Sequence, residues 1–136
     1  PSIAAASIKA IEIAKKSENL REDIRENSNL IRAGLKDLKI PHLDNDSHII
    51  PIHLEDPKLC KEAANVLIEE HGIYIQPVFY PTVPKGDERF RVTITPKHQA
   101  KDIERFLGCL DSVWNKLSLR REQYSPQDLE KIRKIY

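Results

Sequence analysis

The sequence predicts an α+β domain with a three-stranded, mainly antiparallel sheet, helices on one face of the sheet and a long N-terminal helix. Apolar residues first recur at helical spacing from Ile3 to Ile40. Three short segments of alternating or continuous apolar residues follow, interrupted by one helical segment and succeeded by another. Because the expected order is α, β, α, β, β, α, α, without regular β-α alternation, an α+β architecture is favoured.

The composition excludes several classes of protein. The 136 residues contain 22 Lys and Arg and 21 Asp and Glu, a net charge of +1, with 40% hydrophobic residues. This is typical of one packed, soluble domain. No apolar run approaches the roughly 20 residues that span a membrane, and no signal-peptide pattern is present. Near-neutral charge and 6% aromatic residues argue against nucleic-acid binding.

The first segment is expected to form one long amphipathic helix that ends just after Ile40, with a bend as an alternative. Ser17 and Asn27 interrupt its apolar stripe, Gly34 weakens its last turns and Pro41 ends it. The sequence opens on Pro1 directly before this helix and contains no methionine. We therefore expect the chain to be a fragment of a longer polypeptide.

The middle of the chain predicts a strand, a helix and a second strand. A turn over residues 42–47 leads into a strand over 49–54, which Pro51 places at a sheet edge because proline cannot donate a ladder hydrogen bond. Asp56 and Pro57 form a helix start, and Gly72 ends that helix. A second strand over 73–79 follows directly.

The last part of the chain predicts a proline-rich loop over 80–86, a third strand over 89–95 and a helix over 99–117. We place the domain at 1–117. Residues 118–136 are expected to form a basic tail that is solvated at the surface, with a short terminal helix carrying Leu129, Ile132 and Tyr136.

Arg91 is the first candidate site residue. In the third strand Phe90, Val92 and Ile94 share one face, so Arg91 stands on the opposite face. A guanidinium there meets water, pairs with a local acid or faces a cavity, and its planar fork suits a carboxylate. Spacing alone favours a solvated or ion-paired arginine over a ligand site.

The loop over 80–86 is the second candidate. Pro81 and Pro84 restrict the backbone around Thr82, whose hydroxyl can donate and accept hydrogen bonds, and Gly86 is expected to be a flexible joint. Such a loop could close over a substrate. The residues alone favour an ordinary connection between two strands.

The remaining chemistry-bearing residues give weak signals. His48 and His53 are an odd number of residues apart on one strand, so they point to opposite faces and a metal site is not expected. Cys60 and Cys109 lie in apolar helix positions and are expected to act as small hydrophobic residues. Two cysteines alone also favour a reducing compartment over a disulfide framework.

Five segments in a fixed order resemble a known family. They are residues 47–51 (SHIIP), 73–76 (IYIQ), 80–86 (YPTVPKG), 88–92 (ERFRV) and 95–98 (TPKH). In order and spacing they resemble the C-terminal lobe of the 5-aminolevulinate synthases, in the α-oxoamine synthase family. The resemblance implies the small C-terminal domain of a fold-type-I pyridoxal-phosphate enzyme, which condenses glycine with succinyl-CoA for haem biosynthesis.

The resemblance also implies roles for two residues. Arg91 matches the arginine that binds the carboxylate of glycine, and Thr82 matches the loop threonine that contacts the carboxylate of succinyl-CoA. The lysine that holds pyridoxal phosphate, and the residues that bind the cofactor, lie upstream in this family. We therefore expect no catalytic residue in this chain, no activity of the chain alone, and a homodimer as the full-length form.

The resemblance leaves alternatives open. Residues 77–79 depart from the small residue and asparagine that the family carries before Tyr80. Glycine C-acetyltransferases share Pro84-Lys85-Gly86 but have valine at the Thr82 position, and 8-amino-7-oxononanoate synthases have the threonine without the tyrosine. A non-enzymatic α+β binding module is the remaining alternative. The expected compartment is the cytoplasm in a bacterium or the mitochondrial matrix in a eukaryote.

Overall fold

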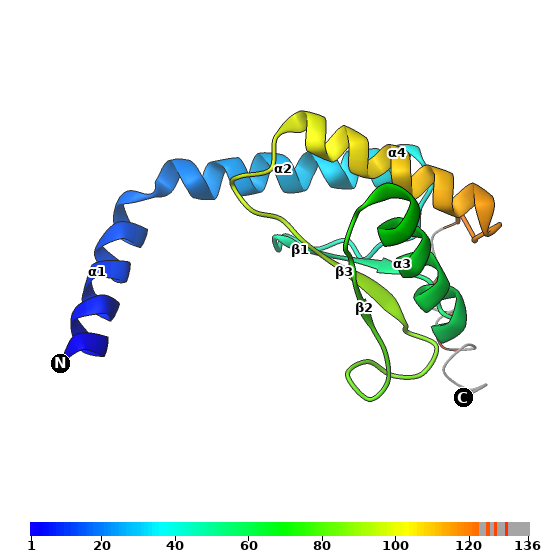
Figure 1. Cartoon of the computed structure of the whole chain (residues 1–136), viewed down its shortest axis with the longest axis horizontal. Helices are drawn as coiled ribbons and strands as arrows, with labels where there is room; N and C mark the ends of the chain where they lie inside the picture. Colours follow the sequence, from blue (N-terminus) through cyan, green and yellow to red (C-terminus); the bar gives the residue numbers. More distant parts are fainter. Residues whose placement is uncertain (123–124, 126, 128–129, 131–136) are drawn as a thin grey trace.

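The computed structural model describes residues 1–122, 125, 127 and 130. Figure 1 shows a small sheet beneath a pair of long helices, with the N-terminal helix extending away from both. The elements, in chain order, are α1 (Ser2–Lys16), α2 (Glu18–Asp37), β1 (Ile49–His53), α3 (Pro57–His71), β2 (Gln76–Val78), β3 (Arg89–Thr93) and α4 (Ala100–Lys116). The expected terminal helix on Leu129, Ile132 and Tyr136 lies outside the described residues.

The long N-terminal helix is divided at Ser17, one of the predicted interruptions of its apolar stripe, into α1 and α2. Ser17 has φ −102° and ψ 45°, and its hydroxyl donates to the Ile13 carbonyl over 2.7 Å. A serine hydroxyl that bonds to a nearby carbonyl competes with the helical ladder and favours a bend. α1 buries no residue, and Ile13 is 55% exposed. The expected apolar stripe is therefore buried only in the later part of α2, at Ile31 and Leu35.

The sheet has the predicted three antiparallel strands, in the order β1-β3-β2. Pro51 lies in the edge strand β1, as predicted, and its carbonyl accepts from the Leu43 N–H over 2.9 Å on the side away from β3. The missing N–H of Pro51 therefore faces the outer edge, where β3 does not need it. β2 is shorter than the expected strand over 73–79, since only residues 76–78 pair with β3.

α3 begins and ends where the sequence predicts. The Asp56 carboxylate accepts from the N–H groups of Lys58 (2.7 Å) and Leu59 (3.0 Å), and Pro57 occupies the first turn. Gly72 ends the helix with φ 65°, in the left-handed region that favours glycine.

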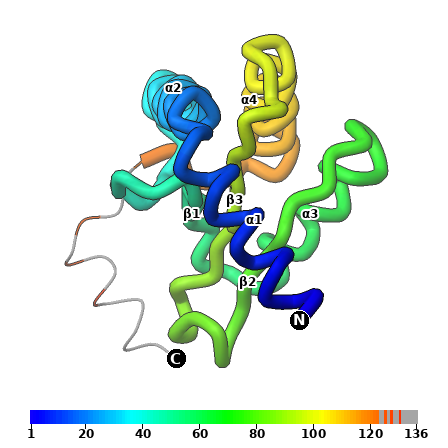
Figure 2. Tube along the Cα trace, turned by 90° about the vertical axis from the view of Figure 1, so that its left-hand side faces the viewer, coloured from blue at the N-terminus to red at the C-terminus, as the bar shows by residue number. Residues whose placement is uncertain are grey.

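The core lies between the sheet and the helices α2, α3 and α4, which gather on one side of it (Figure 2). In α4 the buried residues are Ile103, Leu110, Val113 and Trp114. Gly34 allows α2 to approach α4 closely, because a Cβ there would lie 2.2 Å from Leu107 Cδ1. Its role is therefore helix packing, in addition to the weakening of the helix that its flexibility causes. No described helix is both long and apolar enough to span a membrane.

The first residues of the tail pack on the domain, which differs from the solvated tail expected from the sequence. The Trp114 indole N–H donates to the Arg120 carbonyl over 3.0 Å. Arg121 donates to the Leu38 carbonyl over 2.8 Å and forms an ion pair of 2.7 Å with Asp111. A run of charged residues after a helix does not predict hydrogen bonds to backbone groups that are distant in the sequence. The division of the chain at residue 117 remains a prediction.

Candidate functional site

Arg91 lies in the middle of β3, the central strand, on the face opposite the helices. Its neighbours Phe90 and Val92 are buried and Arg91 is exposed, which confirms the predicted alternation. The strand register places Pro51 of β1 and Gln76 of β2 beside it. Among the described residues no carboxylate lies within ion-pair distance of Arg91. Its fork is therefore available to a ligand.

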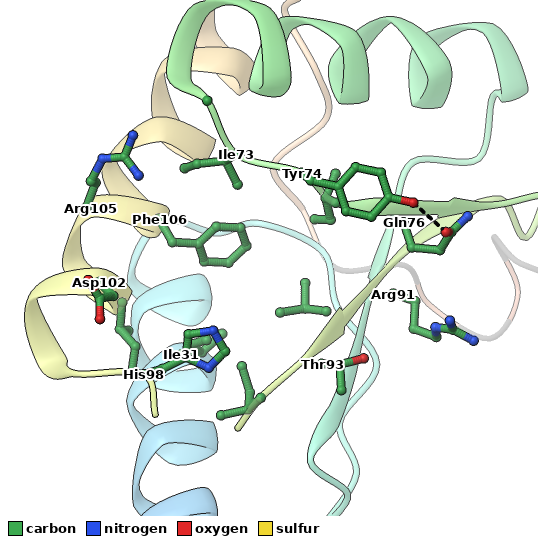
Figure 3. Close-up of a pocket in the computed structure, with 15 residues that line it drawn as sticks. Ile31, Ile73, Tyr74, Gln76, Arg91, Thr93, His98, Asp102, Arg105 and Phe106 are labelled. Carbon is green, nitrogen blue, oxygen red and sulfur yellow. Dashed lines mark hydrogen bonds between the residues drawn. The ribbon is translucent and has the colours of Figure 1, made fainter. Parts of the chain in front are cut away.

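A cavity of about 540 Å³ borders Arg91. Figure 3 shows Arg91 and Thr93 on one side of it, and Arg105 and Phe106 of α4 on the other. The Arg91 guanidinium is directed away from the α4 side. The apolar part of the lining comes from Ile31, Ile73, Ile75, Val92, Ile94, Ile103 and Phe106. An apolar floor with a few polar groups at the rim is typical of a small-molecule site.

The polar groups of this rim hold one another in place. The Tyr74 hydroxyl donates to Gln76 Oε1 over 2.8 Å, and Gln76 Nε2 donates to the Pro77 carbonyl over 2.8 Å. The Thr95 N–H donates to His98 Nδ1 over 3.0 Å, a local contact just before α4. The other charged groups of the lining are also bonded: Asp102 accepts from the Gln99 N–H, and Arg105 donates to the His71 carbonyl. The Arg91 guanidinium has no partner among the described residues.

Thr82 is exposed in the loop between β2 and β3 and does not line the cavity. The Thr82 N–H donates to the Phe79 carbonyl over 2.9 Å, and the Asp87 N–H donates to the Pro84 carbonyl over 3.0 Å. Lys85 Nζ lies 5.6 Å from the centre of the Tyr80 ring. The structure therefore places Arg91 and Thr82 on one β-hairpin, with Arg91 at the cavity and Thr82 in the loop.

Two buried acids that the residue pattern did not predict lie where this loop joins β3. Asp87 and Glu88 are 2% and 3% exposed. Asp87 forms an ion pair of 3.5 Å with Arg89, and the Glu88 carboxylate accepts from the Gly86 N–H over 2.9 Å. Gly86 is itself buried, with φ 83°, so it forms a fixed turn where a flexible joint was expected. Consecutive charged residues before a strand resemble a surface turn, so their pattern does not predict burial.

The two cysteines are free, as expected. Burial raises the pKa of the Cys60 thiol to about 12, and the nearby carboxylate of Glu88 contributes in the same direction. A thiol with this pKa stays protonated and unreactive at neutral pH. In the described part of the chain no three His, Cys, Asp or Glu side chains are grouped so that they could hold a metal ion.

Native Cys60 is expected to resist iodoacetamide at pH 8. The thiolate is the reactive form, and a pKa of about 12 leaves only about one part in ten thousand of the thiol ionised at this pH. Mass spectrometry of the labelled peptides should show Cys60 unmodified in the folded protein, modified after denaturation in urea, and more reactive as the pH is raised towards 12. Rapid modification of Cys60 at pH 8 without denaturant would contradict the buried thiol.

Family profiles and related proteins agree with this fold. The profile of the aminotransferase class I and II family matches residues 1–110. The chain belongs to this family.

Within the family, the curated relatives include proteins named 5-aminolevulinate synthase. The chain is 37% identical over 123 residues to that of Paracoccus denitrificans, and 40% identical over 125 residues to that of Bradyrhizobium diazoefficiens. It is 38% identical over 121 residues to the mitochondrial 5-aminolevulinate synthase of Candida glabrata. The matches cover 89%, 92% and 89% of this chain but only 30%, 31% and 23% of those proteins. The resemblance stated from the sequence motifs is confirmed.

Solved structures confirm the fold. A high-resolution structure of SPT with PLP has a TM-score of 0.68 at 24% identity, covering 72% of this chain and 25% of that one. A crystal structure of 8-amino-7-oxononanoate synthase from Francisella tularensis has a TM-score of 0.70 at 15% identity, covering 82% and 32%. At these identities the likeness establishes the shared α+β fold of this small domain, as predicted.

Proposed function

We propose that this chain is the C-terminal part of a 5-aminolevulinate synthase, which condenses glycine with succinyl-CoA and releases 5-aminolevulinate, CoA and CO2. The observation that carries the proposal is the exposed guanidinium of Arg91 at the rim of an open cavity. It is supported by relatives that are named 5-aminolevulinate synthase and that align with about nine tenths of the chain. The chain spans less than a third of these relatives, so the activity is proposed for the whole protein.

Arg91 would bind the glycine carboxylate through two parallel hydrogen bonds. A guanidinium presents its donors in a planar fork that matches the two oxygens of a carboxylate. β3 is paired on both sides, so the strand that carries Arg91 is held by two neighbours. A substrate held at one end by this fork has its reacting carbon in a fixed orientation.

Thr82 would contact the terminal carboxylate of succinyl-CoA through its hydroxyl. The loop is exposed and bonded at both ends, at Phe79 and at Gly86, so it can present Thr82 to a ligand that arrives from outside the domain. A hydroxyl donor distinguishes a carboxylate from the methyl group that acetyl-CoA carries at the corresponding end.

Pyridoxal phosphate would be held by a part of the protein outside this chain. No lysine lines the cavity beside Arg91, so the described residues offer no amine to hold the cofactor there. When bound, the cofactor acts as the electron sink for chemistry at the α-carbon of the amino acid. We therefore propose that this chain contributes the substrate side of the site, is inactive by itself, and works within a homodimer in the bacterial cytoplasm or the mitochondrial matrix.

The experiment that tests the function is an assay of the full-length protein with glycine and either succinyl-CoA or acetyl-CoA. Formation of 5-aminolevulinate and preference for succinyl-CoA are expected. Preference for acetyl-CoA would instead identify a glycine C-acetyltransferase. An intact native mass close to that of these 136 residues, with no pyridoxal phosphate bound, would favour a binding module and contradict the proposal.

Thr82→Val is expected to raise the apparent KM for succinyl-CoA by roughly tenfold to a hundredfold in the full-length enzyme. The variant keeps the shape of the side chain and removes the hydroxyl, and a hydrogen bond to a charged group contributes about 1.5–3 kcal/mol. Steady-state kinetics measure the change. Thr82→Ser, which keeps the hydroxyl, is the control, and an unchanged KM in the valine variant would remove Thr82 from the site.

A further inference from the structure

Glu88 lies between the 80–86 loop and β3, and its side chain points into the core. Residues 88, 90 and 92 share one side of the chain, and Phe90 and Val92 on this side are buried against the helices. Glu88 is 3% exposed. A carboxylate in the apolar layer between a sheet and its helices is costly to bury unless it is hydrogen-bonded.

The Glu88 carboxylate is bonded to the base of the loop. Its Oε2 accepts from the Gly86 N–H over 2.9 Å, and Gly86 is buried with φ 83°. The backbone carbonyl of Glu88 accepts from the N–H groups of Leu54 and Glu55 over 3.0 and 3.2 Å. This one residue therefore connects the end of the loop both to its own turn and to the segment after β1.

The N-terminal end of the loop is also held by hydrogen bonds. The Phe79 carbonyl accepts from the N–H groups of Thr82 and Val83 over 2.9 and 3.3 Å. Figures 1 and 2 both show the loop between β2 and β3 extending beyond the sheet, on the side far from α2 and α4. The loop does not pack against those helices, so its orientation depends on the hydrogen bonds at its two ends.

The Glu88 carboxylate lies near Cys60 of α3, because it adds to burial, the larger cause, in raising the pKa of that thiol. An apolar side chain of similar size would fill this layer at lower cost. An apolar side chain could not accept the hydrogen bond from the Gly86 N–H, which the Glu88 carboxylate accepts. Glu88 is thus better explained by the geometry of the loop than by packing.

We propose that Glu88 is a positioning residue for the acyl donor: through the Gly86 N–H it fixes the base of the 80–86 loop and thereby the place of Thr82. This inference rests on the proposed function, in which Thr82 contacts the acyl-CoA carboxylate. Glu88 itself touches no substrate, so its removal should affect binding of the acyl donor and leave binding of the amino acid unchanged.

The experiment compares Glu88→Leu, Glu88→Asp and Glu88→Gln with Ile50→Ala in the full-length holoenzyme. Leucine removes the acceptor, and aspartate keeps the charge but withdraws the carboxylate from Gly86 by one methylene. Both should raise the apparent KM for succinyl-CoA by about tenfold, as expected for loss of one charge-assisted hydrogen bond at the loop base, with the KM for glycine within about twofold. Glutamine keeps an acceptor oxygen and should stay within about threefold of the wild type.

Ile50→Ala is the matched control, because Ile50 is fully buried in β1 against the same core and does not line the cavity beside Arg91. It should lower stability without changing the ratio of the two KM values. Hydrogen exchange measured by mass spectrometry should be faster over residues 80–87 in the Glu88→Leu and Glu88→Asp variants and unchanged there in Ile50→Ala.

Two outcomes overturn the inference. One is a KM for succinyl-CoA in the aspartate variant equal to that of the wild type, and the other is unchanged exchange over residues 80–87 in that variant. Because aspartate preserves a buried acid, it tests the bond to Gly86 even where leucine prevents folding. A wild-type protein without synthase activity would instead contradict the proposed function, and the exchange measurement would still test the role of Glu88 in the loop.

Discussion

Arg91→Lys in the full-length enzyme is expected to raise the apparent KM for glycine by about tenfold to a hundredfold. A lysine keeps the positive charge but offers a single ammonium in place of a fork with two parallel donors. Hydrogen bonds to a charged group contribute about 1.5–3 kcal/mol, and 1.4 kcal/mol corresponds to a factor of ten. Steady-state kinetics at saturating succinyl-CoA measure the effect on glycine directly.

Arg89→Lys is the matched control for this prediction. Arg89 lies on the same strand and the same face as Arg91, but its guanidinium pairs with Asp87 and its Nε donates to the Asp87 carbonyl over 2.8 Å. It is therefore engaged within the domain and should leave the KM for glycine unchanged. Equal effects of the two substitutions would show that the strand, rather than the Arg91 fork, affects glycine, and an unchanged KM in Arg91→Lys would exclude Arg91 from the site.

The elements that could be predicted are those fixed by neighbouring residues. Asp56 and Gly72 define α3 because a helix cap and a left-handed turn depend on one residue and the backbone next to it. The alternation around Arg91 predicts its face because the period of a strand is two. Pro51 predicts an edge strand because it lacks an N–H to donate, and a central strand must form ladder hydrogen bonds with a strand on each side.

The features that could not be predicted depend on contacts between distant segments. The cavity beside Arg91 is lined by Ile31 of α2, Tyr74 before β2 and Phe106 of α4, which no local pattern relates. The break at Ser17 was visible as an interruption of the apolar stripe, but the sequence could not distinguish a bend from two helices. Glu88 is buried where a distant segment, Leu54 and Glu55, bonds to its carbonyl, and this contact has no signature in sequence spacing.

Phe90→Ala is expected to destabilise the domain by about 3–5 kcal/mol, the cost typical of a large aromatic side chain removed from a packed core. Phe90 is fully buried in the central strand, and its ring contacts Trp114 edge to face at 6.3 Å between centroids. Net stabilities of single domains lie at about 5–15 kcal/mol, so this loss removes a large part of the total. Trp114 is the single tryptophan of the sequence, and its fluorescence during urea denaturation of the 136-residue chain reports unfolding of this core.

The Phe90→Leu variant separates the effect of the cavity from that of the aromatic contact. Leucine fills most of the volume but lacks the ring, and an aromatic pair contributes about 0.5–1.5 kcal/mol beyond the area that it buries. The leucine variant should therefore be clearly more stable than the alanine variant and less stable than the wild type. A midpoint of denaturation in Phe90→Ala that matches the wild type would contradict the packing of β3 on α4. The same strand carries Phe90 on one face and Arg91 on the other. Phe90→Ala in the full-length enzyme is therefore also expected to weaken glycine binding at temperatures near the unfolding transition, and only there.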